Sequence, residues 1–286
     1  MNIEALFASS IDGLMLGFIY GLAAMGLTLI FGVMRVINLA HGPVIMLGMY
    51  TVFVLTTEMG MNPYLAIVLA VVLGLLFGVV MYFIAVHKVI NAPELTTLLA
   101  TFAVNLIIVG IATVIFTTTP HAIDVQLPSY HAGAMTILGT RVVAVLIASL
   151  ITAALYAFLY RTRTGKSIRA VANNRSAAEL MGINSSLMLG LSFGLGTMLA
   201  AVSGGLISTL FAFSVLSGTV YEVKSFVIVV LGGLGNPTGA LLGGIVLGAL
   251  EGITTMFMPV AWVPVIEYVI FVLILLVRPS GLFGAR

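Results

Sequence analysis

The sequence contains no cysteine among its 286 residues. This absence excludes disulfide bonds, thiolate nucleophiles and cysteine-ligated metal sites. Charged residues are also scarce: they make up 7% of the chain, too few to give a soluble sphere its polar surface. The net charge of +2 is small, so we expect no nucleic-acid partner.

Apolar residues dominate what is present. They make up 61% of the chain and are gathered in runs long enough to cross a bilayer as helices, whereas a β-barrel would show shorter alternating segments. The 31 glycines suit close packing of such helices. We therefore predict an all-α polytopic membrane protein with about eight hydrophobic segments and about seven to nine crossings of the lipid bilayer.

The apolar runs predict the position of each span. Complete spans are expected at residues 13–34, 64–86, 95–116, 142–160, 187–211 and 262–277. A polar loop is expected at 117–140, and a short outer loop that contains Glu222 and Lys224 is expected after the sixth span. In the first span, Gly13, Gly17 and Gly21 recur every four residues, which places them on one helix face. Small residues at this spacing predict a tight contact with another helix.

Two further apolar stretches are interrupted in the middle. Gly42 and Pro43 break the first, and the helix after them is expected to end near residue 55. Gly235, Asn236 and Pro237 break the second, which covers residues 225–253. Proline suits the first turn of a helix, and irregular backbone is tolerated inside a membrane where protein covers it. We predict broken or re-entrant helices at both positions within a single domain, residues 1–286.

One segment holds almost half of the basic residues. Only 11 residues are Lys or Arg, yet Arg161, Arg163, Lys166, Arg169 and Arg175 all lie between two apolar runs. Because cytoplasmic loops are enriched in Lys and Arg, this segment is predicted to be cytoplasmic. The same rule places the N-terminus outside and the C-terminus in the cytoplasm. The segment also has the pattern of a short amphipathic helix.

Motifs for catalysis are missing. Gly165, Lys166 and Ser167 resemble the end of a phosphate-binding loop, but Tyr160 stands where that motif needs a glycine, and no strand precedes it. No serine-hydrolase or zinc-protease motif occurs either. The His and Asp residues of the 117–140 loop match no compact ligand set, so that loop is expected to be solvated. We expect no enzyme activity, no cofactor and no metal site.

A few polar residues lie in or beside the spans. Glu251 and Glu267 could line an outer vestibule and face the ammonium of a substrate, or they could simply reach water near span ends. Asn38, His41 and Asn105 lie deeper. They either line a substrate pathway or form hydrogen bonds between helices. The residues alone leave both alternatives open.

Four stretches carry a resemblance to a known family. They are GLTLIFGVMRVINLAHGPVIMLGMY (26–50), GKSIRAVANNRSAAELMGIN (165–184), FVIVVLGGLGNPTGALLGGIVLGALE (226–251) and RPSGLFG (278–284). The chain resembles the LivH-type permeases of branched-chain amino acid ABC importers. The resemblance implies a multi-pass permease of the bacterial inner membrane that translocates branched-chain amino acids. It also implies four kinds of partner: a homologous second permease (LivM-like), two cytoplasmic ABC ATPase subunits, a periplasmic substrate-binding protein and the lipid bilayer.

The resemblance also implies a role for the basic segment. ABC import permeases carry a cytoplasmic EAA-x3-G coupling motif, and Ser176, Ala177, Ala178 and Gly182 match it with Ser in place of Glu. Residues 161–185 would then be the coupling segment that an ATPase grips, with Ala177, Ala178, Leu180 and Met181 as an apolar face. The expected contact residues are Arg169, Arg175, Ser176, Ala177, Ala178, Glu179 and Gly182. The alternative is a solvated basic loop that only sets the topology.

Two other functions remain open at this stage. A permease for urea or short amides would resemble this chain in the INLAHG region and could share its architecture. An ion-coupled secondary transporter is the alternative from another class. The scarcity of carboxylates in the middle of the spans argues against it.

Overall fold

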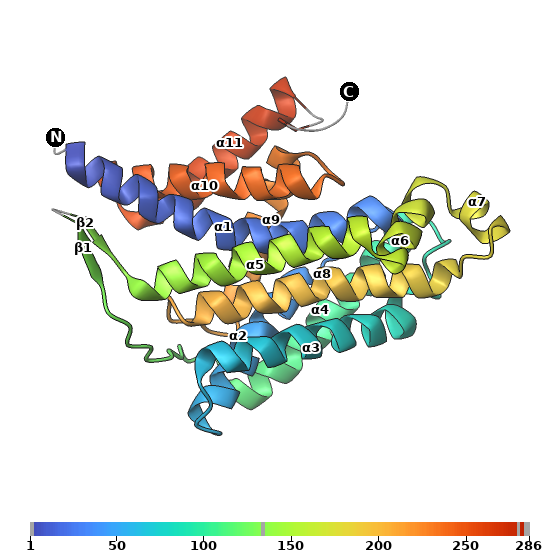
Figure 1. The fold of residues 1–286 in the computed structure, drawn as a ribbon, viewed down its shortest axis with the longest axis horizontal. Coiled ribbons are helices and arrows are strands. Elements are labelled where there is room, and N and C mark those ends of the chain that lie inside the picture. The colour runs from blue at the N-terminus through green and yellow to red at the C-terminus, as the bar shows by residue number, and fades with distance from the viewer. Residues whose placement is uncertain (1–2, 133–134, 279–280, 283–286) are drawn as a thin grey trace.

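The computed structural model describes residues 3–132, 135–278 and 281–282. Its longest helix, α1 (Ile3–Met34), and the mostly buried α8 (Ser185–Ser208) form the middle of a helical bundle (Figure 1). Around them lie α2 (His41–Thr57), α3 (Pro63–Met81) with a π-helical turn at Tyr82–Val86, α4 (Glu94–Phe116), α5 (Gly139–Arg161), α9 (Ser217–Gly232), α10 (Pro237–Phe257), and α11 (Val263–Val277) with a 3₁₀ turn at Val260–Trp262.

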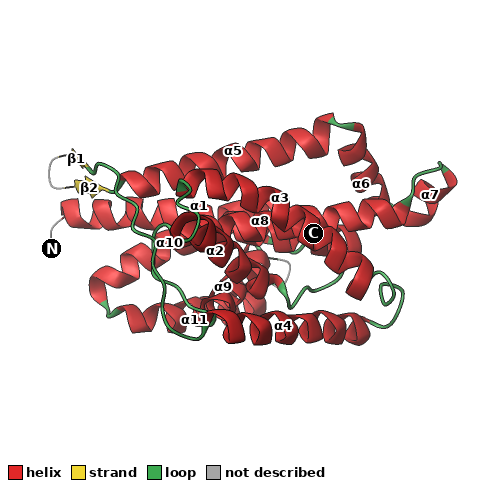
Figure 2. Ribbon diagram, turned by 90° about the horizontal axis from the view of Figure 1, so that it is seen from below, coloured by secondary structure: helices red, strands yellow, loops and turns green. Residues whose placement is uncertain are grey.

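The bundle has two ends that carry different elements (Figures 1 and 2). One end carries a short antiparallel hairpin of β1 (Tyr130–Ala132) and β2 (Met135–Ile137), which the sequence did not predict. We call this the hairpin end. The opposite end carries α6 (Arg163–Asn173) and α7 (Arg175–Leu180), which hold most of the predicted basic cluster. We call it the basic end.

The predicted fold class is confirmed. Within the described residues, seven helices are long and apolar enough to cross a membrane, and α2 is a shorter apolar helix beside them. These helices begin and end within a few residues of most of the predicted spans. The domain limits at residues 1 and 286, and Pro279 in the C-terminal stretch, lie outside the described residues.

A seam of glycines joins α1 to α10. At Gly13 and Gly17 there is no room for a Cβ, because the backbone of α10 at Gly248 and Gly244 already occupies that space. The same crowding occurs in the opposite direction, from α10 toward α1. Without a hydrophobic drive between helices in lipid, such close packing is a main source of helix association. The contact predicted from the four-residue glycine spacing is confirmed.

The first predicted break is confirmed and lies deep inside the bundle. After α1 ends, the chain turns back along it and begins α2 at His41, whose Nε2 is 3.0 Å from the Ala23 carbonyl oxygen. Ala23 precedes the end of α1 at Met34 by about 16 Å of helix, at about 1.5 Å per residue. Helix α2 therefore starts near the middle of α1 and runs toward the hairpin end, with Gly42 and Pro43 in its first turn.

Helix α9 also starts inside the bundle, from the opposite side. The segment before it folds inward from the hairpin end and holds Phe213 by backbone hydrogen bonds to His121, at N–O distances of 2.7 and 2.9 Å. The first turn of α9 then packs on the first turn of α2, and Gly218 and Gly42 leave no room for a Cβ between them. Two short helices thus begin at the same depth and run in opposite directions. Transporters that bind substrate at the membrane midplane use such discontinuous helices.

The second predicted break joins α9 to α10. Gly233 and Gly235 have positive φ angles of 92° and 81°, which glycine adopts without strain. Asn236 then caps α10 by accepting a 3.1 Å hydrogen bond from the Gly239 amide, and Pro237 occupies the first turn. This turn lies at the basic end, where Gly235 touches Gly32 of α1. The break is a tight turn between two helices.

Candidate functional site

The predicted coupling segment, residues 161–185, consists of two helices, so the prediction of a single amphipathic helix was wrong. Helix α6 ends at Asn173, and Asn174 adopts an extended conformation with φ −156° and ψ 102°. Its side chain then caps α7 by accepting a 3.0 Å hydrogen bond from the Ala177 amide. Asparagine competes with helical backbone hydrogen bonds in this way, which explains why the helix divides here.

The glycine of the predicted coupling motif is required by the backbone. Gly182 has a φ of 81°, and its amide donates a 2.9 Å hydrogen bond to the Glu179 carbonyl. The next amide, of Ile183, donates a 3.1 Å bond to the Ala178 carbonyl. These two bonds form a Schellman motif, in which the left-handed residue is usually glycine. The motif ends α7 and returns the chain to the bundle.

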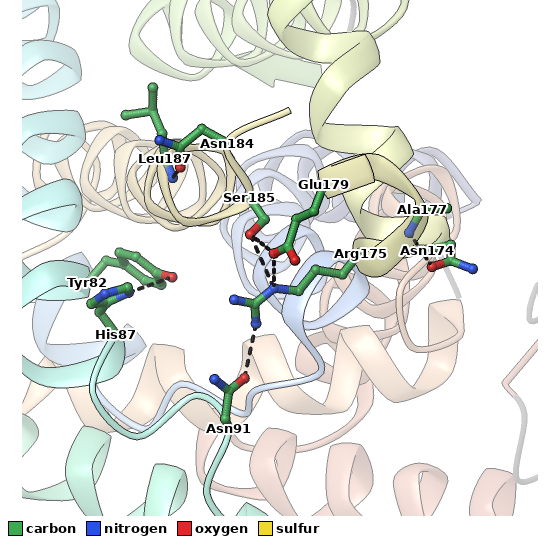
Figure 3. A network of polar contacts seen from close by, with 10 residues as sticks. All are labelled: Tyr82, His87, Asn91, Asn174, Arg175, Ala177, Glu179, Asn184, Ser185 and Leu187. Carbon is green, nitrogen blue, oxygen red and sulfur yellow. Dashed lines mark hydrogen bonds and ion pairs between the residues drawn. The ribbon is translucent and has the colours of Figure 1, made fainter. Parts of the chain in front are cut away.

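Arg175 connects α7 to two other parts of the chain (Figure 3). Its Nε donates to Glu179 Oε1 at 3.1 Å and to Ser185 Oγ at 3.3 Å. One terminal nitrogen donates to Asn91 Oδ1 at 3.1 Å. Since Asn91 belongs to the loop between α3 and α4, and Ser185 begins α8, Arg175 fixes α7 to both. Asn91 and Ser185 were missed because nothing in their local sequence indicates a partner so far along the chain.

Glu179 is ionised in this arrangement. The Ser185 hydroxyl, and after it the Arg175 guanidinium, hold the pKa of the Glu179 carboxyl below its usual value of 4.5. A lowered folded-state pKa adds stability that is present above the usual value and is lost as the pH falls through the folded value. The contacts around Glu179 are therefore complete at neutral pH and fail only in acid.

The exposed face of α7 is smaller than predicted. Leu180 and Met181 are 88% and 82% exposed, and Ala177 and Ser176 are exposed beside them. Ala178 is only 5% exposed, so its predicted place on the outer apolar face is wrong. Its side chain faces the rest of the chain because α7 packs back on α6 and α8. The outer apolar face is thus Ala177, Leu180 and Met181, which we call the α7 tip.

Arg169 fastens α6 to the end of α5. Its Nε donates a 3.1 Å hydrogen bond to the Leu159 carbonyl, and its guanidinium lies 4.4 Å from the centre of the Tyr160 ring. Both partners belong to the last turn of α5, whose final carbonyls have no helical partner of their own. Arg169 therefore positions α6 from within the chain.

Asn38, His41 and Asn105 lie together around the re-entrant segment 35–40. Asn105 Nδ2 on α4 donates a 2.6 Å hydrogen bond to the Leu39 carbonyl, and Thr101, one turn earlier, accepts a 3.2 Å bond from the Leu39 amide. Asn38 accepts a 3.1 Å bond from the Ala40 amide. Irregular backbone needs such partners inside a membrane. Thr101 was not predicted, although it lies on the same helix face as Asn105.

We expect Asn105→Leu to loosen the re-entrant segment. The variant leaves the partly buried Leu39 carbonyl without its side-chain donor, at a cost of about 1–2 kcal/mol, and should lower the apparent melting temperature in detergent by roughly 3–6 °C. The matched control is Thr113→Val on the exposed face of α4, where Thr113 Oγ1 bonds only to Val109 of its own helix. Equal melting temperatures for the two variants would contradict the anchoring role of Asn105.

A buried ion cluster joins α9, α10 and α11. Lys224 Nζ lies 2.6 Å from Glu251 Oε2 and 3.0 Å from Glu267 Oε1, and 4.6 Å from the centre of the Tyr20 ring. The prediction that Glu222 and Lys224 belong to an outer loop was wrong: both are buried residues of α9. Lys224 can be buried because two carboxylates neutralise it. In the sequence, the one indication of this cluster was that Lys224 stands in an otherwise apolar stretch.

A family model described as "Branched-chain amino acid transport system / permease component" matches residues 9–277. The chain belongs to this family. Its membership covers every helix that crosses the bundle, including both broken ones. The chain is accordingly a multi-pass membrane protein, with seven helices of membrane-crossing length among the described residues.

Curated members of the family match this chain along nearly its whole length. LivH of Salmonella typhimurium, named as a high-affinity branched-chain amino acid transport system permease, is 29% identical over 96% of this chain and 94% of its own. BraD of Pseudomonas aeruginosa, with the same description, is 28% identical over 96% and 94%. The probable LivH permease of Methanocaldococcus jannaschii is 29% identical over 92% and 88%. No solved structure matches the chain significantly.

Proposed function

We propose that this chain is the membrane permease subunit of an ATP-driven importer that moves branched-chain or similar apolar amino acids across a bacterial inner membrane. The observation that carries the proposal is the α7 tip. Leu180 and Met181 project from the basic end with 88% and 82% of their surfaces exposed. Large apolar side chains presented on a short helix among charged residues are typical of a surface that fits into a partner's groove.

The basic end is the cytoplasmic end in this proposal, because Lys and Arg collect on the cytoplasmic side of membrane proteins. It carries Arg161, Arg163, Lys166, Arg169 and Arg175. The N-terminus is then outside, since α1 begins at the hairpin end, and α11 ends on the cytoplasmic side. An ATPase on the cytoplasmic side can reach the α7 tip, and a binding protein outside can reach the hairpin end.

The seven predicted coupling residues divide into two groups. Ala177 belongs to the α7 tip and Ser176 is exposed beside it, and both contact the ATPase directly. The second group does not contact the ATPase and instead fixes the shape and attachment of α6 and α7. It consists of Arg169, Arg175, Ala178, Glu179 and Gly182. Arg175 and Glu179 bind Ser185 at the start of α8, and α8 lies at the centre of the bundle. A push on α7 therefore moves the core directly, as rigid elements do in alternating access.

The partners in this proposal are a homologous second permease, two cytoplasmic ATPase subunits, an external substrate-binding protein and the lipid bilayer. ATP hydrolysis belongs to the separate ATPase subunits, so this chain is a transport subunit and not an enzyme. The substrate pathway includes Glu251 at its outer side. Asn38 and His41 each keep one buried nitrogen without a hydrogen-bond partner among the described residues. If α2 moves during transport, these nitrogens can bind the substrate, which supports a place for both residues on the pathway.

The test is uptake of labelled L-leucine into proteoliposomes that contain the assembled complex. We expect uptake that requires ATP, the ATPase subunits and the binding protein. Uptake driven by a proton or sodium gradient without the ATPase would replace the proposal with a secondary transporter. Strong uptake of labelled urea or acetamide, with none of L-leucine, would replace the substrate class and keep the importer.

A further inference from the structure

The ion cluster of Lys224 opens on one side to a pocket of about 310 Å³. The pocket brings the Lys224 ammonium and the Glu251 carboxylate together with an apolar wall that includes Val220, Val260 and Val263. Two carboxylates face the single ammonium in this cluster, so Glu251 can accept a further cationic group. The pocket therefore offers a cation, a carboxylate and a lipophilic surface within one small volume.

A second pocket of about 330 Å³ lies toward the basic end, beside the re-entrant segment. It also contains one cation and one carboxylate, Arg35 and Glu94, and its apolar wall includes Phe31, Leu98 and Leu234. Within the part of the chain that the structure describes, neither charge has an ion-pair partner. Arg35 has a φ of 52°, an unusual backbone angle for a non-glycine residue, and such angles collect at functional sites.

Helix α9 connects the two pockets. Val220, Tyr221 and Lys224, in the first half of the helix, line the first pocket, and Leu234, just after its end, lines the second. Between Val220 and Leu234 the chain covers roughly 20 Å, at about 1.5 Å per helical residue. The half-buried side chains on this stretch include Val223, Phe226 and Val230, spaced three to four residues apart and hence on one helix face. The face carries no charge.

We infer that substrate moves along this face of α9, between the Lys224–Glu251 pocket and the Arg35–Glu94 pocket, and that the path selects a zwitterion with an aliphatic side chain. This inference rests on the proposed function and gives it a route and a chemical class. Each pocket pairs one positive with one negative group, which suits the carboxylate and ammonium of a free amino acid. In the Arg35–Glu94 pocket, where neither charge has an ion-pair partner among the described residues, a simple cation or anion would leave one of the two charges uncompensated.

The apolar middle of the face explains how such a path releases its substrate. Val223, Phe226 and Val230 can contact an aliphatic side chain but offer no partner for its charged groups. A transported molecule must be held well enough to enter and weakly enough to leave. The charged groups are thus bound at the two ends of the path and only the side chain is in contact between them.

The chain is suited to a direct test, because it contains no cysteine of its own. Val223→Cys and Val230→Cys each introduce a single reactive position on the α9 face. The complex is placed in lipid nanodiscs without the binding protein, so that both pockets are open to added molecules. It is treated with methanethiosulfonate ethylsulfonate, a charged reagent that reacts with thiols in water. We expect both cysteines to react, and about 10 mM L-leucine to slow the reaction roughly tenfold for a ligand present at about ten times its Kd.

Two control positions distinguish a cysteine on the substrate path from one in the packed core or in lipid. Val229→Cys, on the same helix, is only 1% exposed and should not react. Ile107→Cys is 59% exposed near the middle of α4, a helix of membrane-crossing length, so we expect lipid to keep the charged reagent from it. Failure of Val223→Cys and Val230→Cys to react would overturn the inference and assign the α9 face to lipid or to a tightly packed helix. Reaction that L-leucine does not slow would also overturn it.

The chemical class is tested with two analogues. Isoamylamine lacks the carboxylate of leucine and 4-methylpentanoate lacks the ammonium, and we expect neither to protect the cysteines. Equal protection by either analogue would contradict a zwitterion path. In a Val230→Cys background, Glu94→Gln and Glu251→Gln should each raise the L-leucine concentration for half-protection about tenfold, equivalent to about 1.4 kcal/mol. Unchanged half-protection in both would remove the two carboxylates from the path.

Uptake by the same complex keeps the two hypotheses distinguishable. ATP-dependent uptake of L-leucine together with unreactive α9 cysteines would retain the importer and reject this route. Protected cysteines in a complex that shows no ATP-dependent uptake would retain the binding face and reject the proposed function.

Discussion

Replacing Leu180 by aspartate is expected to abolish ATP-dependent uptake and to leave the permease inserted and folded. Leu180 is 88% exposed, so its loss removes no contact within this chain. In the proposed complex the side chain enters an apolar groove of the ATPase, where a carboxylate would be desolvated without a partner. Central apolar anchors of this kind are worth about 2 kcal/mol or more, so affinity for the ATPase should fall at least about thirtyfold. Co-purification of the ATPase with the permease measures this loss.

The position of this substitution separates binding from folding. Ala178→Asp would place a charge on a buried side chain, and Gly182→Asp would disturb the left-handed turn of the Schellman motif. Either could lose the ATPase by distorting α7. Leu180→Met is the matched control, because it keeps a large apolar side chain at the tip, and it should retain the ATPase. Normal co-purification of the ATPase with Leu180→Asp would show that the tip is not the contact.

Replacing Gly248 by leucine is expected to prevent the bundle from assembling. The backbone of α1 at Gly13 and Gly17 occupies the space that any Cβ at Gly248 would need. Overpacking against movable side chains already costs about 1–3 kcal/mol, and here the obstacle is a helix backbone that cannot turn aside. We therefore expect little or no folded protein in a detergent extract, measured as the monodisperse fraction in size-exclusion chromatography.

Gly110 provides the matched control for this seam. It lies in the middle of α4, where an added Cβ would meet no atom within 4 Å. Gly110→Leu should accumulate and elute like the unchanged protein, since it makes the same substitution in a membrane helix with open space. If Gly248→Leu behaved like Gly110→Leu, the close α1–α10 packing would be wrong.

The parts of the fold that depend on local sequence were predictable. Apolar length gave the spans, the spacing of Gly13, Gly17 and Gly21 gave the α1 contact face, and Gly and Pro pairs marked both breaks. These signals act over one or two helical turns, so they can be read without knowing what packs opposite. The glycine of the coupling motif belongs to the same class, because its left-handed conformation ends α7 whatever the partner is.

The parts that depend on distant partners were not predictable. Lys224 and Glu222 suggested a loop because isolated charges are costly in a membrane, but Lys224 is buried with Glu251 and Glu267 from two other helices. The burial of Ala178 depends in the same way on how α7 folds back on its neighbours. The spacing of residues in the sequence shows on which face of its own helix a side chain lies. It does not show which other part of the protein packs against that face.

The position of α7 in the working transporter tests the account most directly. Leu180→Cys provides the only thiol in this chain, so a thiol-directed photo-crosslinker can be attached there alone. After assembly of the complex and illumination, the account predicts a covalent product between position 180 and an ATPase subunit, and none from Val114→Cys in the membrane. Absence of an ATPase product from position 180 in a complex that imports L-leucine would contradict the claim that α7 receives the energy of transport.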